Sequence, residues 1–322
     1  MTLSILLKKI LVRTTSLVLG SVTVVVVGYI IFFGFHSPVY KDDGLWVRLK
    51  SNDTHLSSSM RLALQDSPAA AYGQFSWREI APGFETGELT ALVNRNVVDQ
   101  IMLARIDPTR FRFAVCHKSG GYRNVDQWMH TLDAVLVVNG SYFARGGKPA
   151  TPLLSNGKLL GPKEYIAKGG AFTATDGLAR IGDLTNQSWQ TVFQDMTNGL
   201  VSYPILVAAD GSNHVQRKSR WLANRSFIAT DKSGWIVIGT TTDAFFSLDR
   251  LAEFLRQSPL ELAIALNLDG GPVACQAINL NGFERTTYGK WEMRTEGDDA
   301  LLLLTAPYIP PPLRIVVAVF PK

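Results

Sequence analysis

This sequence is poor in the residues that cross-link small secreted domains or build common metal centres. Its 322 residues include only two cysteines, Cys116 and Cys275, too few for a disulfide framework or a cysteine-based zinc site. We expect both to be free thiols, because small buried thiols are common. The five histidines form no His-x-x-x-His pair, which argues against a zinc centre of that kind. Charged residues make up only 18% against 46% hydrophobic residues, a balance that excludes intrinsic disorder.

The small excess of positive charge is concentrated at the N-terminus. The formal net charge is +5, and residues 1–40 hold Lys8, Lys9 and Arg13 but no Asp or Glu. Without these three, 29 basic residues face 27 acidic ones, so the remaining chain is almost neutral. No basic stripe of the kind that binds nucleic acid is visible in the sequence, and we expect no nucleic-acid partner.

One long apolar run lies near the N-terminus. Ser16–Phe35 is uncharged and long enough to cross a bilayer as a helix of about 20 residues. By the positive-inside rule, the basic tail 1–15 stays in the cytoplasm and the rest lies outside. We therefore expect a single-pass anchor in the inner membrane with a periplasmic or extracellular domain. A cleaved signal peptide is the alternative, but its apolar region is usually shorter and ends in a small-x-small site.

The remaining chain divides into a tether and one domain. Residues 36–74 include the polar stretch 51–59 and are expected to be a tether with at most a short helical turn over Met60–Gln65. Residues 75–322 show neither repeats nor a second linker and predict one domain.

Short apolar runs punctuated by glycine predict a mixed α+β domain that is largely β-sheet. Ala134–Val138, Trp235–Ile238 and Leu262–Leu268 are typical of buried strands. Between the last two, Ser247–Gln257 has a leucine face and a capping serine, which predicts a helix. This order predicts a β-α-β crossover with parallel strands.

Small and polar residues follow each of these three buried strands. Asn139-Gly140 follows the first, Thr241 to Asp243 the second and Asp269-Gly270-Gly271 the third. Each cluster alone predicts a tight turn, because Asn-Gly and Asp-Gly are strong turn formers. Since ligands bind at the carboxyl ends of parallel strands, the three together predict a shared site. Glycine there would let backbone N–H groups approach an anion closely.

Arg225 is an isolated charge at the start of another apolar strand, Ser226–Thr230. It could be a solvated strand end. Its guanidinium could also bind a phosphate or carboxylate through two parallel hydrogen bonds.

The ordered series of Asn139-Gly-Ser-Tyr-Phe, the Arg225 strand, Asp243 with its helix, and Asn267-Leu-Asp-Gly-Gly resembles the phosphodiester glycosidase family, which includes bacterial envelope proteins. The resemblance covers roughly residues 75–320. It implies hydrolysis of the bond between a sugar's anomeric carbon and a phosphodiester. For an envelope protein the resemblance implies a sugar-phosphate polymer, a lipid-linked sugar or a related glycan as substrate.

The resemblance implies roles for particular residues. Asp269 is the first choice for the catalytic carboxylate and Asp243 the second, with Arg225 on the leaving phosphate. The substrate-binding residues it implies are Asn139, Gly140, Thr241, Gly270 and Gly271.

Two questions stay open at the level of sequence. Acidic side chains with Asn could also hold a divalent cation, so the cofactor is undetermined. Where family members often have serine after the glycines, this chain has Pro272-Val273-Ala274. A domain that binds glycan or phosphate as an inactive envelope scaffold is therefore the alternative to an enzyme.

Overall fold

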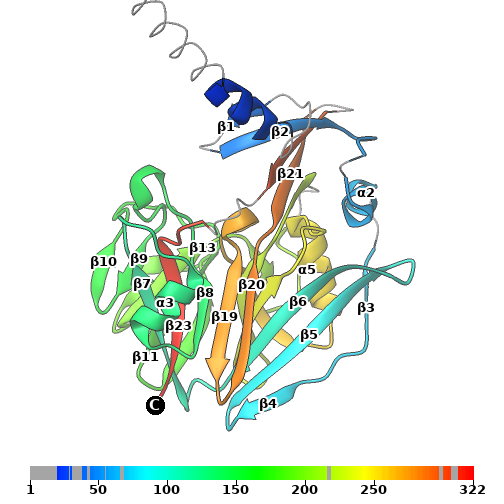
Figure 1. Ribbon diagram of the computed structural model, residues 1–322. Coiled ribbons are helices and arrows are strands. Elements are labelled where there is room, and N and C mark those ends of the chain that lie inside the picture. The colour runs from blue at the N-terminus through cyan, green and yellow to red at the C-terminus, as the bar shows by residue number, and fades with distance from the viewer. Residues whose placement is uncertain are drawn as a thin grey trace, which may run out of the picture.

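The computed structural model describes residues 20–28, 30, 38–41, 44–54, 56–65, 69–215, 219–296, 300–305 and 311–322. These residues form several antiparallel sheets with a few short helices, the largely β α+β fold that the sequence predicted (Figure 1).

An eight-stranded sheet runs through the centre of the molecule in the order β14-β18-β16-β17-β6-β5-β3, with β4 also paired to β5. Its strands are β3 (Ala71–Tyr72), β4 (Arg78–Ala81), β5 (Phe84–Val93), β6 (Asn96–Ile106), β14 (Ile205–Val207), β16 (Ser226–Asp231), β17 (Ile236–Thr241) and β18 (Leu262–Asn267). The strands β16, β17 and β18 are almost fully buried, as their apolar sequences predicted.

Two five-stranded sheets form the neighbouring lobe, in the orders β20-β19-β8-β23-β7 and β10-β9-β13-β11-β12. The first contains β7 (Phe111–His117), β8 (Leu136–Asn139), β19 (Cys275–Leu280), β20 (Phe283–Tyr288) and β23 (Ile315–Pro321). The second contains β9 (Leu153–Ser155), β10 (Lys158–Leu160), β11 (Gly170–Thr175), β12 (Leu178–Asp183) and β13 (Asn198–Ser202). Helices α3 (Val125–Leu132) and α4 (Trp189–Phe193) and the 3-10 turn η1 (Arg145–Gly147) belong to this lobe.

The fourth sheet corrects the prediction of a tether over residues 36–74. Its order is β1-β2-β22-β21-β15. Its strands are β1 (Pro38–Lys41), β2 (Gly44–Lys50), β15 (Trp221–Ala223), β21 (Trp291–Glu296) and β22 (Ala300–Thr305). Because β2 pairs with β22, Trp46, Val47 and Leu49 are buried, and α2 (Ser58–Leu64) buries Met60 and Ala63 nearby. Charged residues flank this short apolar run and its partner strand β22 lies far along the chain, so local sequence did not predict the strand.

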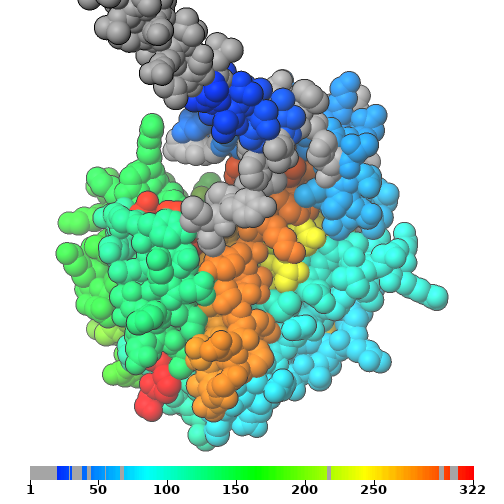
Figure 2. Space-filling model, in the orientation of Figure 1, coloured from blue at the N-terminus to red at the C-terminus, as the bar shows by residue number. Residues whose placement is uncertain are grey.

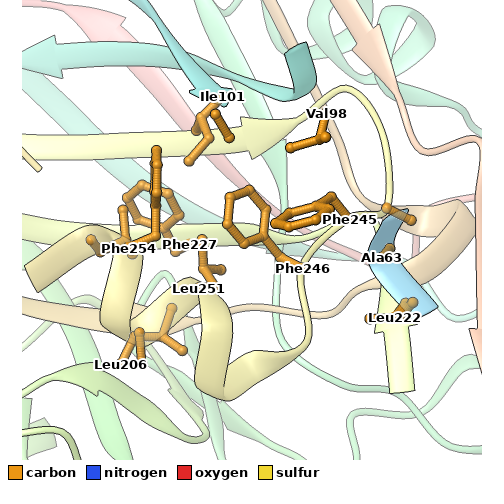
Figure 3. Close-up of a cluster of buried hydrophobic side chains, with 14 of the residues drawn as sticks. Ala63, Val98, Ile101, Leu206, Leu222, Phe227, Phe245, Phe246, Leu251 and Phe254 are labelled. Carbon is orange, nitrogen blue, oxygen red and sulfur yellow. The ribbon is translucent and has the colours of Figure 1, made fainter. Parts of the chain in front are cut away.

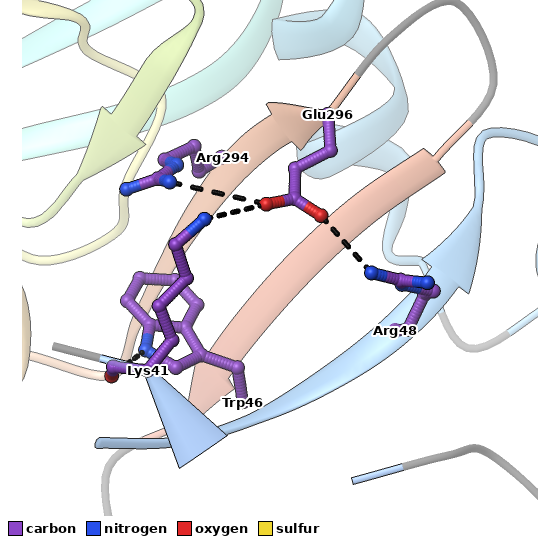
Figure 4. Close-up of polar contacts among 5 residues, drawn as sticks. All are labelled: Lys41, Trp46, Arg48, Arg294 and Glu296. Atoms are coloured by element: carbon purple, nitrogen blue, oxygen red, sulfur yellow. Dashed lines mark hydrogen bonds and ion pairs between the residues drawn. The ribbon is translucent and has the colours of Figure 1, made fainter. Parts of the chain in front are cut away.

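Ion pairs join the first strands of this sheet to β21 (Figure 4). Glu296 accepts from Lys41 at 2.7 Å and from Arg48 at 3.2 Å, and Arg294 lies 3.9 Å away. The Trp46 indole donates to the Lys41 carbonyl at 2.9 Å. Exposed pairs of this kind each contribute at most about 1 kcal/mol, so burial of apolar residues holds this sheet together and the charges align it.

The crossover helix is present as predicted, but its two strands are not neighbours. Helix α5 (Leu248–Gln257) is capped by the Ser247 side chain and connects β17 to β18. Both strands pair antiparallel with β16, which lies between them. The two strands therefore run parallel to each other and end at the same edge of the sheet, where β16 begins.

The apolar face of α5 packs on the central sheet (Figure 3). Leu251 and Phe254 contact a group of aromatic side chains formed by Phe227 from β16 and by Phe245 and Phe246 from the loop before the helix. Phe245 and Phe246 are almost completely buried. This packing anchors the loop after β17 and so fixes one side of the sheet edge.

The predicted membrane anchor, Ser16–Phe35, lies partly outside the described residues. Residues 20–28 are helical, and several of their valines are exposed. Among the residues that the structure describes, no helix combines the length and apolar composition needed to cross a bilayer.

Candidate active site

The clusters predicted to share a site are brought to one edge of the structure. Arg225 immediately precedes β16, and Asp269 follows β18. From the neighbouring lobe, Asn139 at the end of β8 donates its amide N–H to the Asp269 carbonyl at 2.8 Å. The Asp269 N–H donates to the Gly140 carbonyl at 3.0 Å. Strand ends from two different sheets thus meet around Asp269.

A cavity of about 390 Å³ opens at this edge. The residues that line it are Tyr142, Tyr203, Ser219, Trp221, Ala223, Arg225, Leu248, Asp269, Gly270, Gly271 and Glu292. Four of the sequence-predicted site residues, Asp269, Arg225, Gly270 and Gly271, are among them. Asn139, Gly140, Thr241 and Asp243 are not.

Asp269 has the electrostatic environment of a proton-transfer group. Burial raises the pKa of its carboxyl to about 7, and the nearby negative charge of Glu292 also raises it. The Gly270 N–H donates to its Oδ1 at 2.9 Å and, with the positive charge of Arg225, partly opposes this shift. A carboxyl with a pKa near neutrality can exchange a proton at physiological pH.

Arg225 is held in place by backbone carbonyls. Its Nε donates to the Phe246 carbonyl at 3.2 Å and its Nη2 to the Trp221 carbonyl at 2.9 Å. Only 7% of the residue is exposed. Burial lowers the pKa of its guanidinium, but Glu292 and Asp269 oppose this effect, and an arginine remains charged. The anchored guanidinium therefore presents a fixed positive charge to the cavity.

Gly270 and Gly271 let neighbouring side chains pack closely against the backbone. Their N–H groups are already hydrogen-bonded within the protein, so the expectation that these groups bind an anion was wrong. The Gly270 N–H is bonded to Asp269, and the Gly271 N–H donates to the Asn224 carbonyl at 2.8 Å. A Cβ on Gly270 would lie 3.3 Å from Nη1 of Arg225. Gly271 has a φ of +71°, and a Cβ there would overlap the Glu292 carboxylate.

Three other predicted binding residues lie outside the cavity and contact the residues that line it or their neighbours. Both ends of the Asn139 amide are used, since its Oδ1 also accepts from the Cys275 N–H at 3.0 Å. Gly140 packs so tightly on Ile315 that a Cβ would lie 2.4 Å from Cγ2 of that residue. Thr241 accepts from the Arg225 N–H at 2.9 Å. These residues position the chain around the cavity without lining it.

The structure does not bring Asp243, the second-choice catalytic carboxylate, into the cavity. Its carboxylate accepts from the Trp291 indole at 2.5 Å and from the Ser59 hydroxyl at 3.3 Å. Its backbone carbonyl accepts from Asn224 and Thr241. Asp243 sits after β17, on the far side of β16 from Asp269, and its contacts join the loop to β21 and α2.

The cavity also holds a second carboxylate and aromatic side chains that were not predicted from the sequence. Glu292 comes from β21 and accepts a hydrogen bond from the Trp221 indole. Tyr142 and Tyr203 stack at 4.5 Å between ring centroids, and the Tyr142 hydroxyl donates to the Tyr203 carbonyl at 2.6 Å. Tyr142 lies within the Asn-Gly-Ser-Tyr-Phe series, so its position could have indicated a place in the site. No sequence motif marks Tyr203, Trp221 or Glu292 as site residues.

No metal site stands out in the part of the chain that the structure describes. No group of three or more His, Cys, Asp or Glu side chains there is arranged to hold an ion.

A larger cavity of about 620 Å³ lies beside α3, but its described lining has Asp126, Asp133 and Glu284 and no Lys or Arg. That negative lining would repel a phosphate. Cys116 and Cys275 are free thiols, as predicted.

Fold and site together define a β-rich α+β protein with a carboxylate and arginine pocket at a shared sheet edge. A sequence model of phosphodiester glycosidases matches residues 133–300, more than half of the chain. The chain therefore belongs to the phosphodiester glycosidase family.

One solved structure shares this fold at low sequence identity, and a second is a weaker match. The catalytic domain of zebrafish N-acetylglucosamine-1-phosphodiester alpha-N-acetylglucosaminidase, auto-inhibited by its pro-peptide, is 17% identical with a TM-score of 0.53. That match covers 80% of this chain and 85% of the other. A protein from Synechocystis is 13% identical with a TM-score of 0.47, over 80% of this chain and 64% of that one. Comparison with curated proteins gives no match.

Proposed function

We propose that this protein is a hydrolase that cleaves the bond between the anomeric carbon of a sugar and a phosphodiester. The observation that carries the proposal is the pairing of Asp269, whose pKa is about 7, with the anchored Arg225 in one cavity. Both residues lie within residues 133–300, the stretch that the family model matches.

The chemistry assigns one group to each side of the bond. Water attacks the anomeric carbon, the bond from that carbon to the bridging phosphate oxygen breaks, and a free sugar and a phosphate monoester leave. Arg225 stabilises the charge on the departing phosphate. Asp269, in its carboxylate form, stabilises the positive charge that develops on the sugar and assists the attack. A phosphate is a good leaving group, so it needs little protonation.

The aromatic side chains suit the sugar. Tyr203 and Trp221 are 43% and 37% exposed, and both line the cavity. Aromatic rings pack against the apolar faces of sugars while their polar ends remain hydrogen-bonded. Burial raises the pKa of the Tyr142 hydroxyl, which keeps that group neutral beside Asp269.

The proposal is tested by turnover of a panel of sugar-1-phosphodiesters with the purified protein, with and without a chelator. We expect release of free sugar and phosphate monoester from at least one member of the panel. Loss of turnover with chelator would assign a divalent cation to the reaction. Binding that requires Arg225 without any turnover would instead support the inactive envelope scaffold.

We further propose that the protein acts in the cell envelope, on a sugar-phosphate polymer or related glycan, from a membrane anchor over residues 16–35. The uncharged run and the preceding basic residues support this topology. A reporter that is active only outside the cytoplasm should therefore work when fused after Lys322. A fusion at that point that works only in the cytoplasm would contradict the topology.

A further inference from the structure

Basic side chains gather beside the candidate active site, although they are scattered in the sequence. They come from the segments 117–123, 143–150 and 311–316, none of which contains Asp or Glu. The basic residues of these segments are Lys118, Arg123, Arg145, Lys148 and Arg314. We call this set the basic track. Lys118, Arg145 and Lys148 are exposed.

Close contacts place these segments together. The Lys118 N–H donates to the Arg314 carbonyl at 2.9 Å, and Nη1 of Arg314 donates to the Gly121 carbonyl at 2.8 Å. Gly147, between Arg145 and Lys148, is packed so closely that a Cβ would lie 2.9 Å from Cδ of Arg314. The Arg123 guanidinium lies 4.7 Å from the Trp128 ring. Among the described residues, no acidic side chain forms an ion pair with any member of the track.

The basic track lies on the same sheet edge as the cavity. β8 ends at Asn139, β23 begins beside it, and β7 ends next in order. Figure 1 shows this edge at the top of the lobe, where β23 begins, and Figure 2 shows red and green atoms together there. With strands about 4.8 Å apart, the end of β7 lies about 10 Å from the end of β8. The Gly140 N–H donates to the Ile315 carbonyl. Tyr142 lines the cavity and directly precedes segment 143–150.

From this geometry we infer that the substrate is a polyanionic glycan, whose further phosphates or carboxylates bind the basic track while one sugar phosphodiester occupies the cavity. This inference rests on the proposed function for the bond that is cleaved. The end of β7, which Lys118 follows, lies about two strand spacings from the end of β8 beside Asp269, so a substrate that binds there as well needs negative groups beyond the phosphodiester that is cleaved. Exposed, unpaired cations along one edge attract a chain of negative charges and guide it toward the cavity.

The test measures binding of long-chain inorganic polyphosphate to the full chain in detergent, at several salt concentrations. We compare wild type with a triple variant, Lys118→Ala, Arg145→Ala and Lys148→Ala. A matched control, Lys158→Ala, Arg180→Ala and Lys232→Ala, removes three exposed charges that lie outside the track. Polyphosphate should bind the track variant about tenfold or more weakly at low salt, with a shallower salt dependence, and the control about as well as wild type.

Two outcomes would overturn the inference. One is equal weakening of polyphosphate binding in the track variant and the control, which would mean a general charge effect. The other is track-dependent binding only to phosphatidylcholine vesicles that contain phosphatidylglycerol, which would assign the track to a membrane surface. Turnover of a small sugar phosphodiester should be the same in all three proteins. Because polyphosphate binding needs no turnover, failure of the proposed hydrolysis would be seen separately.

Discussion

Replacing Asp269 by Asn should abolish hydrolysis of a sugar-1-phosphodiester while leaving the fold intact. An amide cannot stabilise the developing positive charge or assist water, and loss of such a group lowers turnover by about 10²- to 10⁴-fold. The asparagine Oδ1 can still accept from the Gly270 N–H. Steady-state turnover by the purified variant measures the loss. Asp243→Asn is the matched control, because that carboxylate lies outside the cavity, and it should retain turnover.

The stability of the wild type relative to the Asp269→Asn variant should also depend on pH in a defined direction. The pKa of Asp269 is raised in the folded protein, so its favourable contribution is present at low pH and is lost as pH rises through about 7. Asparagine carries no charge to desolvate. We therefore expect the variant to be at least as stable as wild type above pH 7, as measured by denaturant unfolding at pH 5 and pH 8. A large loss of stability at pH 8 would point to a structural role for the carboxylate.

The same carboxyl should govern the pH dependence of wild-type turnover. Because the carboxylate form is active in the proposed mechanism, kcat/KM should rise with pH to half of its plateau near pH 7. The charge of Glu292 raises the pKa of Asp269, so Glu292→Gln should move this midpoint to lower pH. An unchanged midpoint in that variant would contradict the coupling between the two carboxylates.

Arg225→Lys should keep the positive charge yet reduce turnover severely. Lysine lacks the planar fork that binds the Phe246 and Trp221 carbonyls while facing the cavity. Losing the charge-assisted bonds to phosphate should cost about 2–3 kcal/mol, or roughly 30- to 160-fold in kcat/KM. The measurement is kcat/KM on the best phosphodiester of the panel.

A second arginine, which is partly buried and bonded to backbone carbonyls, supplies the control for this substitution. Arg285 donates to the Leu103 and Gly87 carbonyls and lies outside the cavity. Arg285→Lys should lower the free energy of unfolding but leave the turnover of the folded protein unchanged. Equal loss of turnover in both variants would mean that Arg225 acts only through the stability of the fold.

Local sequence was sufficient for the elements that build the site. Continuous apolar runs predicted β8, β17 and β18, and the leucine face with a capping serine predicted α5. Because β17 and β18 run parallel, their ends lie at one edge, as the β-α-β pattern predicted. The prediction failed for residues 36–74, where pairing of β2 with β22, more than 250 positions away along the chain, creates a strand that local composition does not indicate.

What the sequence by itself determined is the family, the largely β α+β fold and the placement of Asp269, Arg225 and the glycines at strand ends. Only the tertiary structure decided which of these side chains share a cavity. Insertion of β16 between β17 and β18 brings Arg225 beside Asp269 and separates Asp243 from it. In β21, alternation of side chains buries Trp291 and turns Glu292 toward the cavity. Such neighbours depend on pairing between distant strands, which no local pattern of residues encodes.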